Sequence, residues 1–125
     1  MKIENIKFKA KRLDNGEWVK GDLVHSTSYV GISYPSDEFS DVPVVHRVDP
    51  STVCQFTGLK DEDENDIFEG DLLAEKRFPM YEVGYVNSEF AASYIGENTF
   101  IFKLPALSKG CVVCGSIYDR KEGEK

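Results

Sequence analysis

Residues 6–18 read IKFKAKRLDNGEW. Apolar residues alternate with three lysines at the start of this stretch, which is the period-two pattern of a strand with one face buried and the other in water. Asn15-Gly16 follows, and this pair readily adopts the positive φ angles of a tight turn. The stretch therefore predicts a β-hairpin whose second strand covers residues 17–25.

Further strands are predicted along the rest of the chain, with Gly, Pro, Asn and Asp between them. Their predicted ranges are 29–34, 42–48, 52–56, 72–78, 81–86, 100–104 and 111–118. Helical periodicity of ordinary length is not evident. The sequence therefore predicts a mainly β fold, a small barrel-like or sandwich domain of short, mostly antiparallel strands with little helix.

The segment 88–96 fits two structures. Ser88 is a suitable N-cap and Gly96 a suitable terminator for a two-turn helix. As a strand, the same segment places Phe90 and Tyr94 on one face and turns after Gly96 into the next strand. The strand is favoured because it completes a hairpin.

Length and composition indicate a single globular domain. The chain has 125 residues, 41% of them hydrophobic and 30% charged, which is too apolar for a disordered chain. We expect one domain over residues 1–118, followed by a charged tail over 119–125. The N-terminus lacks the apolar stretch of a secretory signal and no run is long enough to span a membrane. A cytoplasmic protein that does not contact membranes is the expectation.

The net charge of −7 is concentrated in one segment. Residues 61–71 hold seven acids and no base, so the rest of the chain is balanced. Binding to nucleic acid is therefore not expected, because affinity for phosphates relies on Lys and Arg. The row Lys7, Lys9 and Lys11 with Trp18 fits a basic stacking surface. It also fits the protection of an exposed sheet edge, which is the favoured interpretation.

Three cysteines and two histidines are the other candidates for chemistry. Cys111 and Cys114 have the spacing of a zinc or redox pair, but the further ligands of a zinc site are scattered and the pair lies in an apolar strand pattern. Packed, reduced thiols are therefore predicted. His25 and His46 lack a nucleophile in a recognisable context. We expect no metal and no cofactor.

The acidic run resembles a calcium loop only at its start. Asp61, Asp63 and Asn65 match the first, third and fifth positions of an EF-hand. Asp66 stands where the loop needs Gly, and Leu72 where it needs a bidentate Glu. A solvated turn is the simpler interpretation.

Two parts of the chain, Gln55-Phe-Thr-Gly-Leu-Lys-Asp61 and Ile67-Phe-Glu-Gly-Asp71, resemble the central signature of the YopX family of phage and prophage proteins. Residues 6–10, 18–23 and 113–119 are similar to the opening, second and closing strands of that family. The resemblance implies a mostly β, barrel-like fold encoded on a phage or integrated element. It implies no particular reaction.

The chain departs from the family pattern at two places. Asp63-Glu64 stands where the family commonly has Asn-Gly at the charged turn, and the Asn-Pro-Glu-Leu-like tail is replaced by residues 120–124. The first departure weakens the argument for a tight turn there. The second puts any contact made by the tail in doubt.

The function expected from these features is that of a non-enzymatic module that binds a host or phage protein. An acidic loop between two glycines can steer a basic partner. A solvated hairpin tip, an acidic DNA mimic or anti-restriction factor, and a small hydrolase with an unrecognised site are the alternatives. Self-association is a further expectation. The candidate contact residues are Asp61, Asp63, Glu64, Asp66, Phe68 and Glu69.

Overall fold

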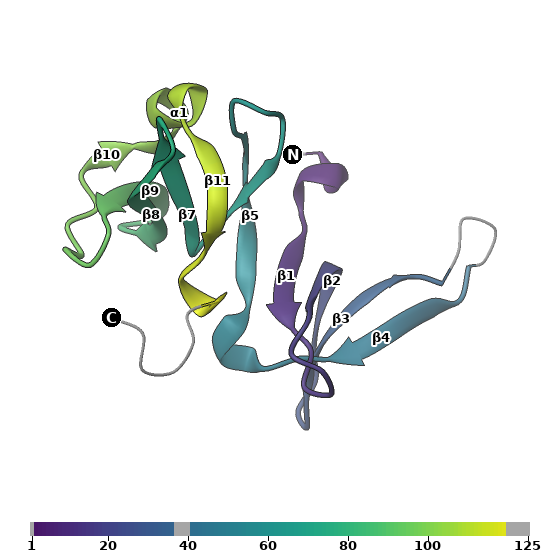
Figure 1. The fold of residues 1–125 in the computed structure, drawn as a ribbon. Helices are drawn as coiled ribbons and strands as arrows, with labels where there is room; N and C mark the ends of the chain where they lie inside the picture. The colour runs from purple at the N-terminus through teal and green to yellow at the C-terminus, as the bar shows by residue number, and fades with distance from the viewer. Residues whose placement is uncertain (1, 37–40, 120–125) are drawn as a thin grey trace. The chain divides into compact units, whose positions relative to one another are not determined.

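The computed structural model describes residues 2–36 and 41–119, which form two compact units (Figure 1). The first unit spans Met1–Phe56 and the second spans Thr57–Lys125. Strands make up most of the described chain, and its one α-helix has four residues. The predicted mainly β fold with little helix is confirmed. The described strands form two open antiparallel sheets rather than a closed barrel.

The first unit is a sheet of neighbouring antiparallel strands in the order β4-β3-β2-β1-β5. The last strand, β5, begins in this unit and continues into the second. The elements are η1 (Ile3–Asn5), β1 (Phe8–Lys11), β2 (Trp18–His25), β3 (Val30–Pro35), β4 (Pro43–Arg47), η2 (Pro50–Thr52) and β5 (Cys54–Lys60).

The predicted first hairpin is confirmed, with a longer turn than Asn-Gly suggests. Lys11 pairs with Trp18, and the Arg12 N–H donates to the Glu17 carbonyl at 2.9 Å. The turn closes through the Gly16 N–H, which donates to the carbonyl of Arg12 at 2.9 Å. Gly16 has φ +72°, a left-handed conformation that glycine adopts without steric cost.

The lysine row of β1 does not protect a sheet edge, so the favoured interpretation was wrong. β1 lies between β2 and β5 and pairs with both. Lys9 is only 9% exposed, and its Nζ lies 4.7 Å from the ring centroid of Trp18. Lys7 lies in the same way over Phe56, at 4.5 Å. The ammonium groups of these two lysines therefore lie over aromatic rings, in the geometry of a cation–π contact.

The opposite face of β1 carries the core of the first unit. Ala10, Ile32 and Val48 are buried there, and Phe8 and Leu23 pack against them. The antiparallel register explains this cluster, because side chains that are paired across strands share a face.

The second unit contains a five-stranded antiparallel sheet in the order β10-β9-β8-β7-β11. The end of β5 neighbours β6, which is the last strand in the order β4-β3-β2-β1-β5-β6. The elements are β6 (Asp66–Phe68), β7 (Asp71–Glu75), β8 (Phe78–Val86), β9 (Glu89–Tyr94), β10 (Phe102–Lys103), α1 (Leu104–Leu107), η3 (Ser108–Gly110), β11 (Val112–Ser116) and η4 (Ile117–Asp119).

The ambiguous segment is a strand, as favoured. β9 pairs with β8 on one side and with β10 on the other, where Ala92 is opposite Phe102. β10 is shorter than predicted, because Leu104 begins α1 with a proline in its first turn. Proline lacks the N–H that a strand ladder needs and suits the start of a helix.

The core of the second unit lies on one face of its sheet. Leu73, Tyr81, Val83 and Ala92 are buried there, and the register places them side by side. The ring of Tyr81 also stacks on Tyr94, with the ring centroids 5.5 Å apart. The remaining buried members of this cluster are Ile67, Leu104 and Cys111.

The expected domain boundaries are not tested by the structure. The charged tail lies outside the described residues beyond Asp119. A single domain over residues 1–118 stays a prediction. Of the residues that the structure describes, none forms a helix long and apolar enough to cross a membrane.

Candidate functional site

The acidic segment forms a tight hairpin turn between β5 and β6. The Asp61 N–H donates to the Asn65 carbonyl at 2.8 Å, and the Glu64 N–H donates to the Asp61 carbonyl at 3.1 Å. Glu64 has φ +66°, in the left-handed region. This is the three-residue hairpin loop in which a turn is followed by one left-handed residue, a position that favours glycine.

Asp61 holds this turn through its side chain. One carboxylate oxygen accepts the N–H groups of Asp63 and Asn65, each at 2.9 Å. The other oxygen accepts the N–H of Val113, in β11, at 2.8 Å. Asp61 is 4% exposed. Burial raises the pKa of a carboxyl group, but these three backbone N–H groups outweigh burial and hold the pKa of Asp61 below its ordinary value.

Three carboxylates project from the turn that Asp61 holds. Glu62, Asp63 and Glu64 are exposed and are called the acidic tip below. Glu62 was not among the predicted contact residues. The available signal was Asp61 at the start of the acidic run, because an aspartate side chain often accepts the backbone N–H two residues on in an Asx turn.

The other predicted contact residues lie deeper in the fold. Phe68 is 1% exposed, and its N–H donates to a carboxylate oxygen of Asp71 at 2.7 Å. Asp66 and Glu69 are half-buried. The structure therefore divides the predicted loop into an exposed tip and a set of residues that hold the fold.

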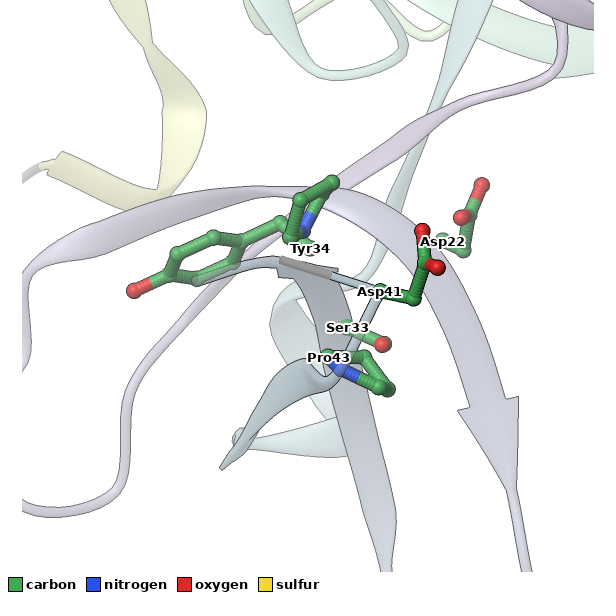
Figure 2. Close-up of a pocket in the computed structure, with 6 residues that line it drawn as sticks. Asp22, Ser33, Tyr34, Asp41 and Pro43 are labelled. Atoms are coloured by element: carbon green, nitrogen blue, oxygen red, sulfur yellow. The ribbon is translucent and has the colours of Figure 1, made fainter. Parts of the chain in front are cut away.

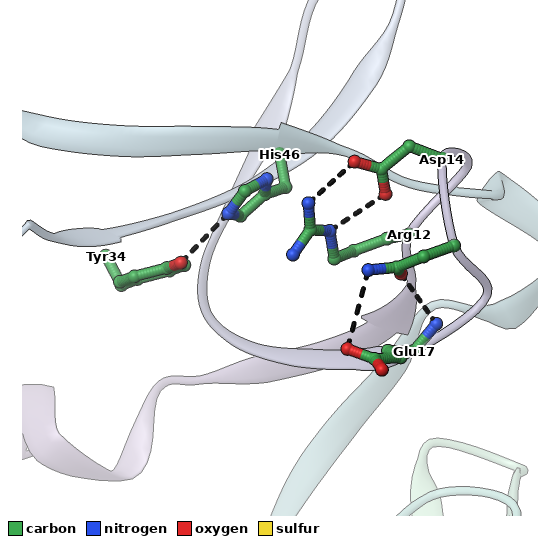
Figure 3. A network of polar contacts seen from close by, with 6 residues as sticks. Arg12, Asp14, Glu17, Tyr34 and His46 are labelled. Carbon is green, nitrogen blue, oxygen red and sulfur yellow. Dashed lines mark hydrogen bonds and ion pairs between the residues drawn. The ribbon is translucent and has the colours of Figure 1, made fainter.

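A second polar cluster lies in the first unit, at the β1–β2 turn and the neighbouring β4 (Figure 3). The Arg12 guanidinium binds the Asp14 carboxylate through two contacts, at 2.6 and 2.9 Å. This hydrogen-bonded pair lowers the pKa of Asp14 and raises that of Arg12. The hydroxyl of Tyr34 lies 2.9 Å from Nε2 of His46.

The structure does not combine the two histidines into one site. His46 is opposite Ile32 on β3, and His25 is opposite Val30 on the other side of the same strand. His25 is exposed at the end of β2. His46 therefore contacts the hydroxyl of Tyr34 on the neighbouring strand and not His25.

A shallow pocket of about 260 Å³ lies beside this cluster in the first unit (Figure 2). Asp22 on β2 and Asp41 place their carboxylates at the same side of the pocket, and Ser33 on β3 lies near them. Both aspartates are exposed to solvent.

The packing prediction for the cysteines is correct at two positions and wrong at one. Cys54 and Cys111 are buried, whereas Cys114 is exposed. A register irregularity in β11 falls between Val113 and Gly115, at Cys114. Among the described residues, no three His, Cys, Asp or Glu side chains gather as metal ligands would.

Comparison of the sequence with known families shows where the chain belongs. A family model described as YopX protein matches residues 7–122. The chain belongs to the YopX family. No curated protein matches the sequence.

Most of the signature residues of this YopX chain lie in the second unit, in β5, in β6 and at the start of β7. The first part ends at Asp61, whose carboxylate bonds the backbone of the turn. The second part ends at Asp71, whose carboxylate accepts the N–H of Phe68. Gly70, with φ +84°, donates its N–H to the Val83 carbonyl at 2.7 Å. The quoted signature thus consists largely of residues that hold the fold, with the acidic tip between its two parts.

Proposed function

We propose that this YopX protein is a non-enzymatic module that binds another protein, with the acidic tip as its contact. The observation that supports the proposal is the rigid support of the tip. Asp61 is buried and bonds three backbone N–H groups, so Glu62, Asp63 and Glu64 are presented on a fixed turn. Pre-ordered charges lose little conformational entropy on binding.

The strained position of Glu64 adds support. A non-glycine residue in the left-handed region costs about 1 to 2 kcal/mol, and the family commonly has glycine there. Backbone strain of this kind is found preferentially where a side chain has a function. The carboxylate of Glu64 is a feature that glycine cannot supply.

The partner that fits an acidic tip is a protein with a basic surface. Clustered charge of opposite sign raises the rate of encounter and selects against partners of like charge. The phage or prophage context of the family makes a host or phage protein in the cytoplasm the proposed partner. A DNA mimic would need carboxylates distributed along a duplex-sized surface, and these three lie in one turn.

The test compares two triple variants in capture from lysate of phage-infected or prophage-bearing cells. Glu62→Gln/Asp63→Asn/Glu64→Gln removes the charges of the tip and leaves Asp61 in place. Glu4→Gln/Glu17→Gln/Glu97→Gln removes three exposed charges elsewhere and is the matched control. Asp61 itself is not changed, because its loss would disturb the fold.

We expect the tip variant to lose a basic partner that the wild type and the control retain. With that partner purified, the association rate of the wild type should fall as salt is raised, and the tip variant should lose most of this dependence. Identical partner lists for the three proteins would show that the tip is only a solvated turn. Turnover of a substrate by the purified protein would favour the hydrolase alternative.

A further inference from the structure

A pocket of about 410 Å³ lies on the second unit, apart from the residues of the acidic tip. Two strands of the sheet, the turn between β9 and β10, and η4 form its walls. The strands β7, β8 and β9 lie side by side in Figure 1. The lining residues are Leu72, Pro79, Glu82, Ile95, Gly96, Asn98 and Ile117.

The walls of the pocket are apolar and are held by backbone hydrogen bonds. The Ile95 N–H donates to the Met80 carbonyl at 3.1 Å, and the Ile117 N–H donates to the Gly70 carbonyl at 2.9 Å. These bonds hold the backbone at two of the apolar lining residues. The pocket is therefore formed in advance of binding, which is usual for ligand sites.

Glu82 is the charged group in this pocket. Its Oε1 accepts the N–H of Gly96 at 3.2 Å, which orients the carboxylate, and Asn98 lines the same pocket. No Lys or Arg is among the described lining residues. An apolar occupant would take the carboxylate out of water without supplying a countercharge, and an anion would be repelled by it.

We propose that this pocket takes the side chain of an arginine from a partner protein. The methylene stem would pack against the apolar walls, and the guanidinium would bind Glu82. Arginine suits the pocket better than lysine, because its several donors can bond a carboxylate and an amide oxygen such as that of Asn98 together. The inference rests on the proposed protein-binding function for the source of the side chain, but not on the acidic tip.

The test uses two short peptides that differ in one group. One carries a central arginine between alanines, and the other carries citrulline, which has nearly the same shape without the charge. Each is titrated into the full chain and followed by the NMR signals of the Gly96 amide and of the Ile95 and Ile117 methyl groups. We expect the arginine peptide to shift these signals and the citrulline peptide to bind about tenfold more weakly.

Two variants make the assignment specific. Glu82→Gln keeps an oxygen acceptor for the Gly96 N–H and should weaken binding of the arginine peptide about tenfold. Glu97→Gln changes an exposed charge in the same turn that does not line the pocket, and should leave binding unchanged. The tip variant, Glu62→Gln/Asp63→Asn/Glu64→Gln, should also bind the arginine peptide normally. The acidic-tip proposal and the pocket proposal can therefore fail independently.

Several outcomes would overturn the proposal. These are equal binding of the two peptides, equal losses in the Glu82 and Glu97 variants, shifts confined to other residues, and no binding at millimolar peptide. A variant truncated after Asp119 tests whether the chain's own tail occupies the pocket. If removal of residues 120–125 strengthens peptide binding, the chain's own charged tail fills the pocket in place of a partner.

Discussion

At the scale of the single residue, Asp61 has the largest predicted effect on stability. Asp61→Asn replaces one of two acceptor oxygens with a donor, so a buried backbone N–H loses its partner. We expect the free energy of unfolding to fall by about 1 to 3 kcal/mol, measured by urea denaturation. Asp63→Asn, at an exposed position, should change it by less than about 0.5 kcal/mol. Equal losses in the two variants would contradict this role for Asp61.

The pH dependence of the same variant checks the charge of Asp61. The pKa of Asp61 is lowered in the folded chain from an ordinary value of 3.8, so its ionised form stabilises the fold. This contribution is complete above pH 3.8, and is lost as the pH falls through the folded-state pKa. The difference in stability between wild type and Asp61→Asn should be constant near neutral pH and shrink below about pH 4. A constant difference down to pH 2 would show that charge is not involved.

At the scale of the element, the β5–β6 turn contains one residue in an unfavourable conformation. Glu64 has φ +66°, and Glu64→Gly should raise the free energy of unfolding by about 1 kcal/mol, because glycine adopts this conformation without a steric clash. Asp63 is not among the positive-φ residues, so Asp63→Gly should lower stability instead. The two variants are compared by thermal denaturation. A loss of stability in both would contradict the strain at Glu64.

At the scale of the whole molecule, the fold separates one accessible thiol from two inaccessible ones. Cys114 is exposed, whereas Cys54 and Cys111 are buried. A thiol reagent should label one cysteine in the native chain and three after denaturation, and Cys114→Ser should abolish the native labelling. Although Cys114 is exposed, partial desolvation of its thiol and the negative charge of Asp71 raise its pKa, so labelling should be slow at neutral pH and faster as the pH rises. Rapid labelling of Cys54 or Cys111 in the native chain would contradict the packing.

Local pattern was sufficient to predict the first hairpin and the strand at 89–94. Alternation of side chains and the glycines at the ends of each segment act over a few residues, and tertiary packing did not override them. The same pattern did not show that β1 is an interior strand, because its pairing with β5 joins segments far apart in the chain. The lysines of β1 therefore looked solvent-facing from sequence, although Lys9 is buried against Trp18.

At the candidate site, too, local sequence and long-range packing determine different features. The amino-acid pattern was enough to show that seven acids are concentrated in residues 61–71, with Gly58 before them and Gly70 among them. Which of these acids are exposed depends on tertiary packing. Asp61 is buried because its carboxylate bonds Val113, which is 52 residues away in the chain. A carboxylate on a turn is solvated unless backbone donors from another strand replace the water, and the position of β11 depends on packing throughout the second unit.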